Sequence, residues 1–124
     1  MKKEVVTQLA PEALGPYSQA IETDNLVFIS GQLPIDRSTG NMPSTIEEQA
    51  TQSLKNISYI LDACGLTMDS IVKTTILLND INNFGKVNEI YGSFFKAPFP
   101  ARICYQIVAL PKGALIEIEA IATK

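Results

Sequence analysis

Apolar residues recur at helical spacing between Ile46 and Cys64, and no other feature constrains the fold of this chain as strongly. Thr45 followed by Glu48 matches a capping box at the start of this run, and Gly65 supplies a stop at its end. A helix with one apolar stripe has to bury that stripe against another element. The rest of the chain must therefore provide an apolar surface that this helix can cover.

Most other apolar residues fall in short runs that are typical of β-strands. We expect strands near residues 4–7, 18–22, 26–30, 71–78, 100–108 and 115–121. A second helix is expected from about Asn83 to Phe95, because Pro98 and Pro100 prevent its continuation. The predicted order β-β-β-α-β-α-β-β indicates an α+β fold, in which two helices cover one face of a mixed sheet. A chain of 124 residues has the size of one domain, residues 1–124.

The last two strand runs carry charged residues on otherwise apolar patterns. Arg102 lies in the first run and Glu117 in the second, and residues 110–114 between them contain the Pro and Gly of a tight reversal. If the two runs pair as a hairpin, Arg102 and Glu117 belong to neighbouring strands. An arginine fork suits a substrate carboxylate, and a glutamate beside it can handle a proton or position a water. The alternative is a structural ion pair of Arg102 with Glu117 or Glu119.

The absence of certain residue types limits the catalytic mechanisms that this chain can use. The chain contains no histidine, which removes the most common general base and the most common metal ligand. Ser-His and Cys-His nucleophilic mechanisms are therefore excluded. No carboxylate or cysteine cluster has the spacing of a metal loop, and no Gly-rich phosphate loop occurs. We expect chemistry without cofactor or metal, carried by Arg, Glu, Tyr, Ser, Cys, backbone groups and water.

Charge and hydropathy patterns limit the partners. The formal net charge is −3 with Lys and Arg scattered singly, so nucleic-acid binding is disfavoured. No apolar run is long enough for a bilayer span and no secretory signal is evident, so we expect a cytoplasmic protein without a membrane partner. Cys64 and Cys104 are expected to be free thiols. Ile, Val and Tyr on the uncovered sheet face favour burial against another subunit.

Six segments follow one another in an order and spacing that together are highly specific. They are Gly15–Ala20, Ser30–Pro34, Gln49–Asn56, Val87–Tyr91, Pro100–Arg102 and Leu110–Ala120. Through these segments the chain closely resembles the RidA (YjgF) family of reactive-intermediate deaminases. The resemblance implies a chorismate-mutase-like (bacillus-type) α+β fold and a homotrimer with active sites in the clefts between subunits. It also implies hydrolysis of 2-iminobutanoate and 2-iminopropanoate to 2-oxo acids and ammonia.

The same resemblance assigns roles to individual residues. It implies that Arg102 holds the substrate carboxylate and that Glu117 activates water or moves the proton. Glu117 is preferred to Glu119 by family position only, since strand alternation places both on the same face. The remaining pocket positions match Tyr17, Ser30, Gly31, Asn88 and Cys104. We expect Cys104 to line the pocket and not to act as a nucleophile, because no histidine can activate it.

The residues also admit plainer interpretations. Tyr17 can be a packed loop aromatic, Ser30 can simply close a strand, and Asn88 can be an exposed polar position on the second helix. Two other functions also fit. A non-catalytic trimer could bind a 2-oxo acid through Arg102 and report it to a regulatory partner. RNA cleavage or translation inhibition, also attributed to members of this family, is disfavoured by the acidic charge and the absence of histidine.

Overall fold

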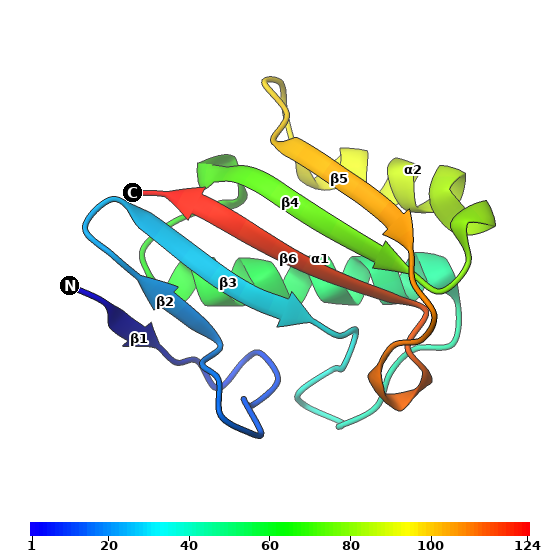
Figure 1. Ribbon diagram of the computed structural model, residues 1–124, viewed down its shortest axis with the longest axis horizontal. Coiled ribbons are helices and arrows are strands. Elements are labelled where there is room, and N and C mark those ends of the chain that lie inside the picture. Colours follow the sequence, from blue (N-terminus) through cyan, green and yellow to red (C-terminus); the bar gives the residue numbers. More distant parts are fainter.

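The order of elements along the chain agrees with the prediction. The computed structural model describes residues 1–124. Its strands are β1 (Lys3–Val5), β2 (Ala20–Glu22), β3 (Leu26–Gln32), β4 (Ile71–Leu78), β5 (Ala101–Gln106) and β6 (Ile116–Thr123). Its helices are α1 (Ile46–Ala63) and α2 (Phe84–Phe94), and short 3₁₀ turns lie at Met68–Ser70, Ile81–Asn83 and Pro111–Gly113. Figure 1 shows both helices behind a single sheet, so one sheet face is covered and the other is open.

Helix α1 begins and ends where its sequence signals predicted. The Thr45 hydroxyl accepts a hydrogen bond from the backbone N–H of Glu48 at 3.1 Å and donates one to the Glu48 carboxylate at 2.9 Å. At the other end, Gly65 has a φ of +73°, a left-handed conformation that glycine adopts without steric cost. These caps supply partners for backbone groups that the helix ends leave unpaired.

The pairing of the last two strands differs from the prediction. The sheet has the order β1-β2-β3-β6-β4-β5, and β4 pairs with β5 in parallel while its other pairings are antiparallel. The mixed sheet is confirmed, but the predicted hairpin between residues 100–108 and 115–121 is wrong. Helix α2 connects β4 to β5 as a crossover, which places β5 parallel to β4 at the sheet edge. Strand β6 then returns between β3 and β4.

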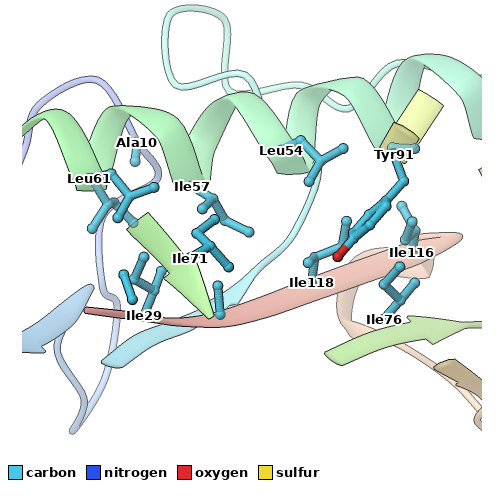
Figure 2. Close-up of a cluster of buried hydrophobic side chains, with 14 of the residues drawn as sticks. Ala10, Ile29, Leu54, Ile57, Leu61, Ile71, Ile76, Tyr91, Ile116 and Ile118 are labelled. Carbon is cyan, nitrogen blue, oxygen red and sulfur yellow. The ribbon is translucent and has the colours of Figure 1, made fainter. Parts of the chain in front are cut away.

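The core lies between α1 and the covered face of the sheet. Figure 2 shows Leu54, Ile57 and Leu61 of α1 pointing towards sheet residues that include Ile29 and Ile118. Each of these side chains is almost fully buried, and burial of one such side chain contributes about 1.5–3 kcal/mol. Neither helix combines the length and the apolar character that crossing a membrane requires.

The open face carries both charged and apolar side chains. Alternation along β6 buries Ile116 and Ile118 beneath the helices and leaves Glu117 and Glu119 on the other side. Three apolar residues of the open face are between 43% and 49% exposed: Phe28 on β3, and Ile103 and Tyr105 on β5. The apolar character predicted for the uncovered face is therefore confirmed.

Candidate active site

Four of the predicted site residues line one cavity. Tyr17, Ser30, Gly31 and Glu117 lie in the wall of a cavity of about 820 Å³ that opens over β3 and β6. Glu119 lies in the same wall, as its position two residues further along β6 predicts. This cavity is large enough for a small organic acid.

A β-bulge in β3 brings its backbone close to Glu117. Ile29 pairs with Ala120 and Gln32 pairs with Ile118, so two residues, Ser30 and Gly31, stand opposite one residue of β6. A Cβ atom on Gly31 would lie 2.9 Å from Cδ of Glu117. A side chain at residue 31 would therefore force the Glu117 carboxyl out of its present position.

Ser30 and Tyr17 belong to the loop side of the cavity. The Ser30 hydroxyl donates a hydrogen bond of 2.6 Å to the backbone oxygen of Ser18, which ties the bulge to the segment before β2. Tyr17 follows the Gly15–Pro16 turn, and its side chain is 54% exposed. The Tyr17 ring is thus free to contact a bound molecule. Ser30, through its hydrogen bond to Ser18, does more than close its strand.

The pKa of the Glu117 carboxyl is raised from its ordinary value. Burial is the main cause, because the charged form loses water, and the neighbouring Glu119 carboxylate adds to the effect. No lysine or arginine lies within ion-pair distance of Glu117, since the ion pairs of this chain involve Lys3, Lys96 and Lys124 with other acids. A carboxyl with a pKa moved towards neutrality suits proton transfer.

Arg102 lies away from this cavity. Strand β4 separates β5 from β6, and Arg102 pairs with Thr74, a buried residue on the helix-covered face. The prediction that Arg102 and Glu117 occupy neighbouring strands is therefore wrong. Adjacent strand partners point to the same face, so Arg102 lies on the covered side of the sheet and Glu117 on the open side. The alternative of an ion pair between Arg102 and Glu117 or Glu119 is also excluded.

Side chains of helix α2 contact the Arg102 side chain. Its Nη1 donates a hydrogen bond of 2.8 Å to Oδ1 of Asn88, so Asn88 is more than an exposed polar position. The guanidinium carbon lies 4.9 Å from the ring centroid of Tyr91 and 5.3 Å from that of Phe84. These distances are typical of cation–π contacts. The positive charge is thus held by aromatic faces and one amide, with no acid as partner.

Cys104 lies on the same strand and the same face as Arg102. Its side chain is partly buried against the core, and it does not line the cavity that contains Glu117. Burial raises the pKa of the Cys104 thiol, and the Arg102 charge opposes this rise. At neutral pH the group is therefore a protonated thiol and a weak nucleophile. Cys64 packs at the end of α1, and both cysteines are free, as predicted.

Sequence reasoning missed the polar residues that hold the cavity loops. Buried Gln19 accepts a hydrogen bond from Thr7 N–H at 2.8 Å and donates to the backbone oxygens of Ala10 and Pro11. Gln49 on α1 accepts from the Leu115 N–H and donates to the Pro43 oxygen, both at 2.9 Å. Both glutamines lie within the segments that resemble RidA proteins, which was the available signal. No group of three His, Cys, Asp or Glu side chains is placed to hold a metal ion.

Comparison with known families decides the identity of the fold. A sequence model described as endoribonuclease L-PSP matches residues 7–124. The chain belongs to this family. The solved structure of the YjgF gene product from E. coli, a protein of the same fold, superposes with a TM-score of 0.95 at 44% identity over 98% of each chain. The resemblance to RidA (YjgF) proteins is thereby confirmed.

Family members with specific names are similar over nearly their whole length. The human protein named 2-iminobutanoate/2-iminopropanoate deaminase is 51% identical over 98% of this chain and 90% of its own. Reactive Intermediate Deaminase A from Arabidopsis thaliana, a chloroplastic protein, is 56% identical over 99% of this chain and 67% of its own. The structure of E. coli TdcF with bound serine has a TM-score of 0.95 at 42% identity, and 98% of each chain is covered.

Proposed function

We propose that this chain is a 2-iminobutanoate/2-iminopropanoate deaminase, which converts a 2-imino acid and water into a 2-oxo acid and ammonia. The observation that carries the proposal is the 51% identity with the human protein of that name over 98% of this chain. The serine bound to TdcF, a relative of the same fold, favours a small ligand with a carboxylate. A substrate of this size fits the cavity beside Glu117.

The active site is completed between copies of the chain in a closed homotrimer of chorismate-mutase-like fold. Glu117 and Arg102 lie on opposite faces of one sheet, with β4 between their strands. One subunit therefore contributes Glu117, Tyr17, Ser30 and Gly31 to each site. Its neighbour contributes Arg102, Asn88 and Cys104. Exposed Phe28, Ile103 and Tyr105 give the open face an apolar surface that such an interface would bury.

Arg102 binds the substrate carboxylate. Its planar guanidinium can donate two parallel hydrogen bonds to the two carboxylate oxygens, which fixes both the position and the orientation of the substrate. In this chain only the bond to Asn88 uses its N–H groups. The remaining donors are available to the ligand.

Glu117 carries the proton through the reaction. Its ionised carboxylate takes a proton from a water molecule as the water oxygen bonds to the imine carbon and the C=N π bond breaks. The proton then passes to the nitrogen of the tetrahedral intermediate. This gives a neutral carbinolamine with one OH and one NH2 group. Glu117 then takes the hydroxyl proton as the C=O π bond forms and the carbon–nitrogen bond breaks, and it passes this proton to the departing nitrogen. Ammonia leaves, the 2-oxo acid forms, and Glu117 is ionised again. The raised pKa of Glu117 supports this exchange because taking and returning a proton are then closer in free energy.

A coupled turnover assay tests the proposal. A threonine dehydratase generates the imine, and semicarbazide traps whatever imine persists. We expect this protein to lower the trapped imine and to speed 2-oxobutanoate formation. Binding of 2-oxobutanoate without faster imine loss would instead establish the non-catalytic sensor.

The description of the family as endoribonuclease L-PSP favours one second candidate, RNA cleavage. Its test is an RNA digestion in which the parent protein is compared with Glu117→Gln and Arg102→Lys variants purified in parallel. Cleavage lost in both variants would support the nuclease. Equal cleavage by all three samples would identify a contaminant, and no cleavage leaves the deaminase as the function. The net charge of −3 favours the last result.

A further inference from the structure

The guanidinium of Arg102 is fixed in place and yet has few partners. An arginine has five N–H donors, and here the side-chain hydrogen bond to Asn88 at 2.8 Å is the one that the chain supplies. Two aromatic rings, those of Tyr91 and Phe84, lie 4.9 Å and 5.3 Å from its central carbon. Ring faces attract a cation without using its N–H groups. The contact therefore restrains the side chain and leaves its donors free.

Tyr91 is itself held rigidly. It is 4% exposed, and its hydroxyl lies 2.7 Å from the Thr74 hydroxyl in a buried hydrogen bond. Its ring also packs on Phe95, with ring centroids 4.6 Å apart. Figure 2 shows Tyr91 reaching from α2 towards the sheet, with its hydroxyl at the sheet end. Burial raises the pKa of Tyr91, so the phenol is neutral and the guanidinium meets a ring face, not a phenolate.

We propose that Tyr91 is a positioning residue for Arg102: its ring, held by burial and by packing on Phe95 and assisted by Phe84, holds the guanidinium so that its unpaired N–H groups meet the substrate carboxylate. An arginine on a flexible stem loses rotamer freedom when it binds an anion, whereas a stacked arginine has lost that freedom beforehand. The identity of the anion rests on the proposed function. The contact between Tyr91 and Arg102 does not.

Arginine side-chain NMR provides a readout of the contact that is independent of turnover. The chain has two arginines, Arg37 and Arg102, so two Nε–Hε signals are expected and Arg37 is an internal control. Ring currents of Tyr91 and Phe84 should displace the Arg102 signal. Tyr91→Leu removes one ring and should move that signal towards the position of a free arginine, while the Arg37 signal stays in place. An unchanged Arg102 signal in folded Tyr91→Leu would overturn the proposal.

Binding and kinetics provide the second readout. For Tyr91→Leu we expect the Kd of 2-oxobutanoate to rise about two- to fivefold, the size of an exposed cation–π contact. KM for the imine should rise by a similar factor with a smaller change in kcat. Phe84→Leu, at a partly buried position, should act in the same direction and keeps the test valid if Tyr91→Leu unfolds. Unchanged Kd in both variants would count against the positioning role.

Two comparisons separate positioning from a general loss of structure. In an Arg102→Lys background, Tyr91→Leu should weaken 2-oxobutanoate binding no further, because the stacked guanidinium is already gone. A full additive loss would mean that Tyr91 acts on the fold alone. The double variant Tyr91→Phe with Thr74→Val keeps the ring and removes both hydroxyls, so binding should return to within about twofold of the parent. Failure of that rescue would show that the ring is not what matters.

Failure of this inference and failure of the proposed function are distinguishable. If the parent protein does not hydrolyse imines but the Arg102 signal shifts in Tyr91→Leu, the function is wrong and the positioning contact stands. If the parent hydrolyses imines while signal, Kd and KM are all unaffected by Tyr91→Leu and Phe84→Leu, the positioning role is wrong.

Discussion

Glu117 and Arg102 occupy contrasting positions in the same sheet. Glu117 lies on β6, an interior strand between β3 and β4, where burial raises its pKa and the wall of a cavity surrounds it. Arg102 lies on β5, the edge strand, where one amide and two aromatic rings hold it beside α2. The first position suits a proton carrier, and the second places a cation at the edge of the sheet.

This separation keeps both groups available for chemistry. If Arg102 and Glu117 paired within one chain, the carboxylate would be stabilised in its charged form and the arginine fork would be occupied. On opposite faces neither group neutralises the other. Each copy of the chain then contains two incomplete sites, and the proposed trimer joins one group of residues from each of two neighbours.

The largest effect on this comparison is expected from Glu117→Gln. The substitution keeps the size of the side chain and removes its basicity, so kcat for imine hydrolysis should fall about 10²–10⁴-fold. Binding of 2-oxobutanoate should change little, because Arg102 and not Glu117 is the residue proposed to bind the carboxylate. The coupled dehydratase assay and calorimetry measure the two quantities.

The pH dependence of the parent protein supplies the control for Glu117. The base must be ionised, so kcat should fall as pH drops through the Glu117 pKa, which burial raises from its ordinary value. The Glu117→Gln variant should not show this fall in kcat at low pH. Above the folded-state pKa of Glu117, the Glu117→Gln variant should also be more stable towards unfolding than the parent, because ionising a carboxyl with a raised folded-state pKa opposes folding. This difference in stability should vanish below the pKa of an unfolded glutamate. A parent rate in Glu117→Gln would exclude the proton-transfer role.

The next effect concerns the close approach of β3 to Glu117. Gly31→Ala places a methyl group 2.9 Å from Cδ of Glu117, so the carboxyl must move. Displacement of a catalytic group by about 1 Å costs on the order of 10²-fold in rate. Gly92→Ala is the matched control, because open space surrounds that helical position and alanine favours helices. Equal kcat/KM for the two variants would show that the bulge does not position Glu117.

Arg102→Lys tests the other half of the comparison. Lysine keeps the charge and loses the planar fork and the stacking, so 2-oxobutanoate binding and kcat/KM should both fall by about 1.5–3 kcal/mol, roughly ten- to a hundredfold. The fall in kcat as the pH drops through the Glu117 pKa should remain in this variant. If this variant binds 2-oxobutanoate as tightly as the parent protein does, Arg102 is not part of the binding site.

Cys104→Ala should have the smallest effect. A thiol whose pKa is raised by burial is mostly protonated at neutral pH, so the change is the loss of a small apolar group and the rate should stay within about threefold. Single-turnover measurements on the folded variant decide this point. Loss of essentially all turnover with ligand binding intact would establish an obligatory thiol.

Local signals predicted the elements of this fold well. The Thr45 cap and Gly65 fixed the ends of α1, and the β-branched run Ile71–Leu78 coincides with β4. Two-residue alternation also predicted that Glu117 and Glu119 share a face. These features depend on neighbouring residues in the sequence, which is why pattern alone is sufficient.

The pairing of strands and the place of Arg102 could not be obtained in the same way. The Pro111–Gly113 turn permits a hairpin, but the crossover through α2 puts β5 on the far side of β4. Alternation states which residues share a face and not which face the helices cover, so the relation of Arg102 to Phe84 and Tyr91 was not foreseen. The bulge at Ser30 and Gly31 likewise depends on β6, which lies distant in the sequence.

Complementation between two damaged subunits tests the shared site most directly. Glu117→Gln and Arg102→Ala proteins, each poorly active alone, are dissociated, mixed in equal amounts and reassembled, and native mass spectrometry verifies that mixed trimers form. If each site takes Arg102 from one subunit and Glu117 from its neighbour, about one quarter of the sites in random trimers contain both groups, and about that share of parent activity returns. Mixed trimers with no more activity than the two variants measured separately would show that a single chain builds the whole site, and would contradict this account.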